Sequence, residues 1–123
     1  MNDQTNKTQE LEERLLRLSV RTIKLLQNEK SIPQSVKTQL IKSVTSIGAN
    51  YDEAVNAISK ADFRNKIFIS KKEANESRYW LKIIQELVGD TSDYLSIENE
   101  ISELIKIFQA IVNTMKRDSD NGQ

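Results

Sequence analysis

The sequence contains no cysteine and no histidine among its 123 residues. Disulfide bonds, zinc sites built from these residues and nucleophile–base systems that use them are therefore excluded. Three glycines and one proline leave few forced turns, which favours long helices over a β-sandwich with many turns. Because the phosphate-binding, dinucleotide-binding and serine-hydrolase motifs are also missing, we expect no catalytic, cofactor or metal site and no enzymatic activity.

The composition fits one compact domain with a well-solvated surface. Apolar residues make up 37% of the chain and charged residues 29%. Eighteen basic residues balance 18 acidic ones, so no global charge draws the chain onto nucleic acid or an anionic membrane. The first residues lack the apolar core of a signal peptide, and no apolar run reaches the roughly 18 residues of a membrane span. Together with the absence of cysteine, these features lead us to expect a cytoplasmic protein with no membrane contact.

Apolar residues recur at helical spacing in four segments. The segments cover residues 7–27, 33–58, 60–88 and a last stretch from 92 or 96 to 116. Pro33 suits a first helical turn, Ser59 is a candidate N-cap and Gly89 is a candidate helix stop. Helices of this length with short connections predict an antiparallel up-down-up-down four-helix bundle. We assign it to one domain, residues 7–117, and expect disordered ends at residues 1–6 and 118–123.

The apolar surface is wider than a monomeric bundle needs. Beside the stripes that face the core, the first and third segments carry additional apolar strips, formed by Leu16, Val20 and Ile23 and by Ile69, Trp80, Ile83 and Leu87. Monomers seldom leave contiguous apolar patches of this size in water. We therefore predict a homo-oligomer with these strips in its interface. The alternative is a tilted bundle that buries both strips internally.

Several polar residues stand where a helix would ordinarily carry better helix formers. Ser43, Ser46, Asn50 and Glu53 fall within about 80° of one another on the second segment. Asn50 and Glu53 could bond across helices and fix their register, as polar residues do in coiled-coil seams. Glu73 and Glu76 border the apolar strip of the third segment. We interpret these six residues as packing and pairing devices, and a ligand site is the alternative.

The sequence suggests what Gly48, Glu73 and Glu76 contact. Gly48 costs a helix about 1 kcal/mol relative to alanine, and the close approach of a neighbouring helix is a plausible return. Glu73 and Glu76 could reach Arg17 or Arg21 of the same or of a neighbouring chain.

A basic stripe follows the third segment. Lys60, Arg64, Lys71, Arg78 and Lys82 fall within about 40° of one another on a helix. In an oligomer the stripe would be repeated once per subunit, and contacts with phosphates would add. The stripe predicts binding of RNA or DNA, with an ordinary solvated face as the alternative. Among the aromatic residues, only Phe68 is near enough to suggest base stacking.

Three sequence blocks follow one another at residues 43–54, 59–66 and 72–81: S-x-x-S-I-G-A-N-Y-x-E-A, S-K-A-D-F-x-x-K and K-E-A-x-E-x-x-Y-W-L. Together they resemble the family of proteins encoded in intervening sequences of bacterial 23S ribosomal RNA, also called four helix bundle proteins. The resemblance implies an antiparallel four-helix bundle that assembles into a ring-like homopentamer, in a family whose biochemical function is not established. Relatives that accompany diversity-generating retroelements resemble basic pentamers that bind nucleic acid and a reverse transcriptase.

Two functional hypotheses follow. The first is a non-enzymatic oligomeric module that binds RNA or DNA through its basic helix faces. The second is an assembly or scaffold protein that recognises a protein partner and no nucleic acid. Neither hypothesis involves a small-molecule substrate or a cofactor.

Overall fold

Four helices make up the regular structure of the computed structural model, which describes residues 3–121. They are α1 (Asp3–Gln27), α2 (Gln34–Val55), α3 (Lys60–Val88) and α4 (Ser92–Asn121). No strand occurs in this part of the chain, so the predicted all-α class with four helices is confirmed. Over the same residues, no helix offers a stretch long and apolar enough to span a lipid bilayer.

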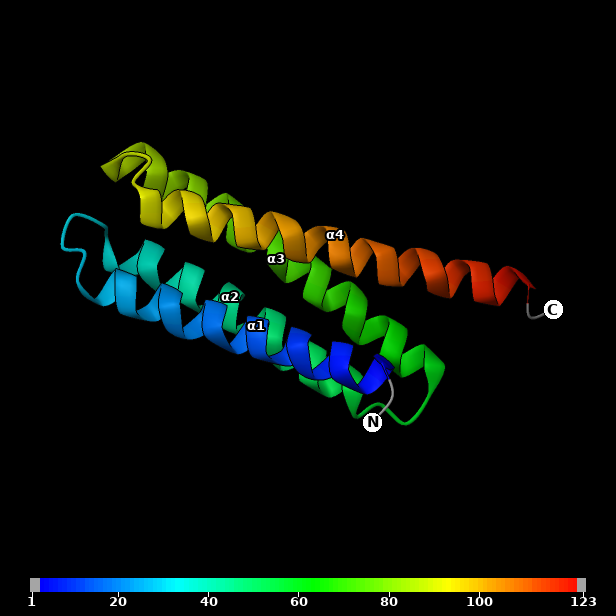
Figure 1. The fold of residues 1–123 in the computed structure, drawn as a ribbon. Coiled ribbons are helices and arrows are strands. Elements are labelled where there is room, and N and C mark those ends of the chain that lie inside the picture. Colours follow the sequence, from blue (N-terminus) through cyan, green and yellow to red (C-terminus); the bar gives the residue numbers. More distant parts are fainter. Residues whose placement is uncertain (1–2, 122–123) are drawn as a thin grey trace.

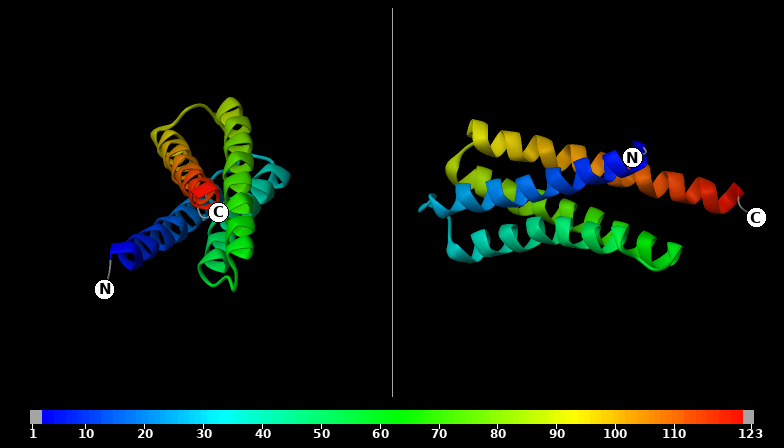
Figure 2. Two further views of the ribbon diagram at one scale, coloured as in Figure 1. Left: turned by 90° about the vertical axis from the view of Figure 1, so that its right-hand side faces the viewer. Right: turned by 60° about the horizontal axis from the view of Figure 1, so that its bottom comes forward.

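The chain turns back at each connection, and each helix lies beside the one before it (Figure 1). The contact between α2 and α3 is the most extensive, and the contact between α1 and α4 is the smallest. Figure 2 shows α1 inclined away from α4 toward its N-terminal end. A pocket of about 850 Å³ lies between these two helices, so α1 is attached to the bundle mainly through α2.

The ends of α3 follow local rules that are visible in the sequence. Ser59 has extended backbone angles and its side chain accepts a hydrogen bond from the Asp62 N–H at 3.0 Å, which makes it the N-cap. Gly89 ends the helix with φ of 95°, a conformation that glycine adopts at little cost. The predicted range of residues 60–88 is therefore confirmed.

Four helix ends differ from the prediction. α2 begins at Gln34, because Pro33 is its N-cap and not part of the first helical turn. α2 stops at Val55 and not at Ile58, because the chain must turn before Ser59 caps α3, and Ile58 is 97% exposed and not part of the core. α1 already begins at Asp3 and α4 continues to Asn121, where the sequence suggested disorder. No glycine or proline interrupts either helix. Residues 1–2 and 122–123 of the predicted disordered ends lie outside the described part of the chain.

The core consists of the residues that helical periodicity selects on each segment. Its completely shielded large side chains are Ile47, Ile67, Leu81, Ile84, Ile101, Leu104 and Phe108. Ile32, in the connection between α1 and α2, also belongs to the core with 4% exposure. Val55, which the periodicity placed on the core face of α2, is 40% exposed because it forms the last turn of that helix.

Small side chains lie between α2 and α3. The Ser77 hydroxyl donates to Ser43 Oγ at 2.8 Å, and Ser43 Oγ donates to the Leu40 carbonyl at 3.2 Å. The Ser70 hydroxyl donates to the Ile47 carbonyl at 2.9 Å, from α3 to α2. Side chains of this size let two helix backbones approach closely, and the hydrogen bonds satisfy the buried hydroxyl groups.

Ala74 lies on the same seam between Ser70 and Ser77, and its side chain is fully buried. We predict that Ala74→Leu lowers the free energy of unfolding by about 1–3 kcal/mol, because the added methylenes would overpack the seam. Urea unfolding followed by circular dichroism measures the change. The matched control is Ala61→Leu on the exposed face of α3, which should change stability by no more than about 0.5 kcal/mol. Equal effects of the two substitutions would contradict close packing at Ala74.

Candidate nucleic-acid interface

The basic stripe lies on α3, a helix of 29 residues. Lys60, Arg64 and Lys82 are exposed, whereas Lys71 and Arg78 are half-buried with their charged groups carried at the surface of the helix. From Lys60 to Lys82 the stripe is about 33 Å long. A single regular helix therefore fixes the spacing of all five cationic groups.

The stripe is poor in ion pairs. Among residues whose side chains the structure describes, the three ion pairs involve none of its members. Arg78 Nη2 donates to Asn75 Oδ1 at 3.1 Å, a neutral partner that leaves the positive charge uncompensated. Near the end of α3, Lys82 shares a pocket with Glu86, Asp90 and Glu98. The segment from Lys60 to Arg78 is thus the most cationic part.

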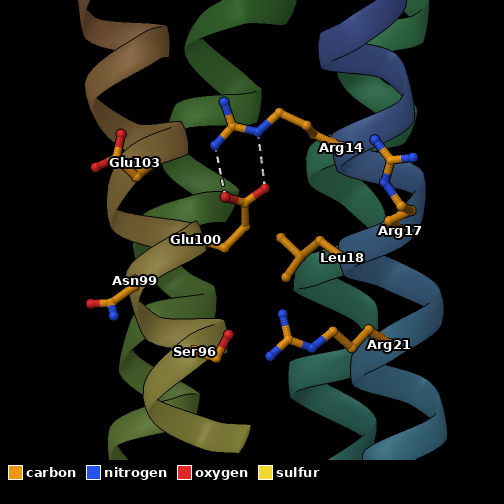
Figure 3. A pocket seen from close by; sticks show the side chains of 8 residues that line it. All are labelled: Arg14, Arg17, Leu18, Arg21, Ser96, Asn99, Glu100 and Glu103. Atoms are coloured by element: carbon orange, nitrogen blue, oxygen red, sulfur yellow. Dashed lines mark hydrogen bonds and ion pairs between the residues drawn. The ribbon is translucent and has the colours of Figure 1, made fainter.

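A second group of basic residues lies on α1, where it faces α4. Figure 3 shows Arg14, Arg17 and Arg21 at a pocket of about 420 Å³ that Glu100 and Glu103 line from the opposite helix. Arg14 Nε and Nη2 donate to the two carboxylate oxygens of Glu100 at 3.0 and 2.7 Å, and this pairing raises the pKa of Arg14. Because this group is mixed with acidic side chains, it suits a phosphate backbone less well than the α3 stripe does.

The polar residues of α2 have different partners. Ser43 is fully buried against Ser77 of α3, and Glu53 forms an ion pair across the helices with Lys66 at 3.6 Å. Asn50 was expected to bond to another helix, but its Nδ2 donates to the Ser46 carbonyl, one turn earlier in α2, at 2.9 Å. An asparagine side chain in a helix can hydrogen-bond to a backbone carbonyl one turn earlier in the same helix.

Among the described side chains, Glu73 and Glu76 form no ion pair with α1. Arg17 contacts Glu13 at 3.6 Å, and Arg21 lines the pocket between α1 and α4. Loss of hydration and the charge of Glu76 raise the pKa of Glu73, while Lys72 and Lys42 act in the opposite direction. An intrachain ion pair with Arg17 or Arg21 does not occur among the described side chains, and the contact to a neighbouring chain stays a prediction.

The apolar strips remain partly in solvent. Leu16 is 65% exposed, Val20 42% and Leu87 54%, and Ile23, Ile69, Trp80 and Ile83 are half-buried. Leu16 borders a groove of about 450 Å³ whose other wall includes Gly48 and Ala49 of α2. A Cβ added to Gly48 would lie 3.4 Å from Leu15 Cβ, so this glycine lies at van der Waals distance from α1. Leu16, Val20 and Leu87 are thus the most exposed members of the two strips in the single chain.

Two surface features of the structure were not predicted from the sequence. Tyr79, identified only as part of a family block, is 59% exposed and lies one helical turn before Lys82. The apolar cleft between α1 and α4, with Leu11, Phe63 and Ile111 in its lining, has no signature in any single helix. A helical-wheel comparison of aromatic and basic positions could have found Tyr79, whereas the cleft arises only from the tilt of α1. No group of side chains able to hold a metal ion occurs among the described residues.

Glu73→Gln tests the environment of this carboxyl group. With a raised pKa, the folded chain holds the proton more tightly than the unfolded chain, so stability falls as pH rises from about 4.5 through the raised value. We predict that Glu73→Gln removes this fall and raises the melting temperature at neutral pH. Thermal unfolding at a series of pH values measures it, with Glu10→Gln on the exposed side of α1 as control. Destabilisation at neutral pH would instead indicate a cationic partner for Glu73.

Comparison with known proteins agrees with the arrangement described above. The family model of the 23S rRNA-intervening sequence protein matches residues 7–110. A solved structure from Bacteroides thetaiotaomicron VPI-5482, described as a protein with unknown function from the S23 ribosomal protein family, is 39% identical in sequence. The similarity covers 82% of this chain and 96% of that one, with a TM-score of 0.75. No curated protein matches the chain. Since the family match extends over most of the four helices, the chain belongs to the 23S rRNA-intervening sequence protein family.

Proposed function

We propose that this protein is a non-enzymatic homo-oligomer that binds the phosphate backbone of RNA or DNA through the basic stripe of α3. The observation that carries the proposal is a row of cationic side chains along one side of a long helix that form no ion pair with any side chain the structure describes. Lysine and arginine contacts to phosphates supply most of the sequence-independent affinity for nucleic acid. The lack of histidine and cysteine supports a role without catalysis.

A neutral chain can bind nucleic acid when its charges are segregated. The stripe places five basic residues on one helix face, while the acidic Glu100 of α4 is directed toward Arg14 of α1. Binding then depends on the local potential and not on the net charge of zero. In an oligomer with one stripe per subunit, several stripes could contact one polynucleotide and their phosphate contacts would add.

Self-association is the second part of the proposal. The strip on α1 that includes Leu16 and Val20 differs from the strip on α3 that includes Trp80 and Leu87, so a contact between the strips would join unlike surfaces of two copies. Heterologous contacts close into rings when the rotation between copies permits it. A ring of this kind agrees with the ring-like homopentamer of antiparallel bundles that the family resemblance implies. We place this assembly in the bacterial cytoplasm.

The alternative function is a scaffold that recognises a protein. The cleft between α1 and α4, about 850 Å³ in volume, favours it because amphipathic helices bind in grooves with an apolar floor and polar edges, and this lining combines apolar side chains with charged ones such as Lys7 and Asp118. Such a partner would bind with weak dependence on salt, whereas binding to phosphates weakens steeply as salt rises.

Charge reversal on the stripe tests the nucleic-acid proposal. We predict saturable binding of labelled RNA and DNA that weakens at least tenfold between low and near-physiological salt. Reversing Lys71 and Arg78 to glutamate should abolish most of this binding without regard to base sequence. Fluorescence anisotropy measures both effects, and reversing the exposed Lys24 and Lys30 provides a control with the same change in net charge. Lack of binding at low salt, or equal loss in the control, would reject the proposal.

Leu16→Glu tests self-association. The leucine is 65% exposed, so the substitution should cost the folded chain little, whereas a carboxylate at an apolar interface should dissociate the subunits. Analytical ultracentrifugation should therefore find a lower mass for the variant at micromolar concentration. Leu95→Glu, at a 40% exposed leucine of α4, is the matched control and should keep the wild-type mass. A monomeric wild-type protein, or a variant of unchanged mass, would overturn the proposed interface.

A further inference from the structure

An outer row of side chains runs along α3 beside the basic stripe. Arg64, Phe68, Lys72, Asn75, Tyr79 and Lys82 follow at intervals of three or four residues, the spacing at which neighbours meet on a helix surface. Five of the six are exposed, and Asn75 is half-buried. The row, which shares Arg64 and Lys82 with the basic stripe, thus interleaves aromatic and cationic side chains, with the neutral Asn75 between Lys72 and Tyr79.

Neither aromatic side chain of the row belongs to the hydrophobic core. Phe68 is 43% exposed and Tyr79 59% exposed, and both are missing from the side chains that pack against the buried cluster. Phe68 has Arg64 one turn before it and Lys71 and Lys72 one turn after it. An apolar ring surrounded by three cationic groups suits a ligand that combines flat rings with negative charge.

The spacing fits an extended polynucleotide strand. Phe68 and Tyr79 are separated by about 16 Å along the axis of α3, and each is displaced by about 60–80° around the helix from the centre of the basic stripe. Phosphates held on the stripe would therefore leave the attached bases over the aromatic row. Bases in a duplex are paired and stacked inside the helix, so only a single strand could offer them to these rings.

We propose that the outer row is a stacking platform that makes single-stranded nucleic acid the preferred ligand of α3. This inference rests on the proposed function, because the basic stripe must first hold the phosphates. Phe68 and Tyr79 each stack on one base, and Lys72 adds a contact to the backbone. Because base–aromatic stacking tolerates any base, the platform selects unpaired strands and not a particular sequence.

The structure supplies its own reporter for stacking on Tyr79. The ring of Trp80, the single tryptophan of the chain, lies edge-on to the Tyr79 ring with a centroid distance of 5.4 Å. A base that stacks on Tyr79 would change the surroundings of Trp80. We expect single-stranded oligonucleotides to change the tryptophan emission and duplexes to leave it nearly constant.

The test compares a Phe68→Ala, Tyr79→Ala double variant with the wild-type protein. A labelled 20-nucleotide oligothymidine or oligouridine strand and a 20-base-pair duplex serve as probes in fluorescence anisotropy at low salt. We expect the double variant to lose affinity for the single strands by at least about tenfold, with less than about twofold change for the duplex. Tyr79→Phe, which keeps the ring, should restore stacking at its position, and Leu95→Ala is a control for removing an exposed apolar side chain.

The other possible results separate failure of the stacking platform from failure of the proposed function. If the wild-type protein binds both probes and the double variant binds them equally well, or loses both equally, the platform is wrong while the proposed function stands. If the double variant changes the mass of the oligomer, the two rings belong to a subunit contact and the inference fails. If the wild-type protein binds neither probe, the proposed function fails together with the platform.

Discussion

The close approach of α2 and α3 is the constraint on which the rest of this structure depends. Ser43, Ser70, Ala74 and Ser77 fill the seam with small side chains, and the hydroxyl groups bond across it instead of remaining unsatisfied. Such a seam fixes both the distance and the register of the two helices, because a shift by one turn would break the hydrogen bonds that Ser70 and Ser77 make to α2. The Glu53–Lys66 pair continues the same contact toward the surface.

Fixing α3 in this way also distributes its other residues around the molecule. Part of the helix is buried against α2 and α4, and the remaining surface is divided between a basic stripe, an exposed aromatic row and a partly apolar strip. All three belong to one rigid element, so their mutual distances do not depend on a loop. The residues that are unusual in a helix, Gly48 and Asn50, thus lie on α2, whereas the basic stripe and the aromatic row lie on the neighbouring α3.

The helices could be read from the sequence because their signals are local. The cap at Ser59 and the stop at Gly89 define α3, and the spacing of apolar residues identifies the core face of each helix. The sequence was wrong where a helix end depends on the following turn, as at Ile58. It did not reveal that Asn50 would bond to the Ser46 carbonyl of its own helix, and a bond from Asn50 to a neighbouring chain stays a prediction. The tilt of α1, which opens the cleft to α4, results from packing among all four helices and has no local signature.

The tilt of α1 also makes local stability differ between the helices of the fold. Besides its contact with α2, the helix has only a small contact with α4, where Arg14 pairs with Glu100, and both side chains of that pair keep contact with solvent. Elements with few contacts open locally at lower free energy than the whole domain unfolds, so amide hydrogens of α1 should exchange before those of α2 and α3. In an assembly that covers Leu16 and Val20, subunit association would hold α1 closed as well. The order of the first helix would then depend on protein concentration, and dilution would loosen it before the core of the bundle melts.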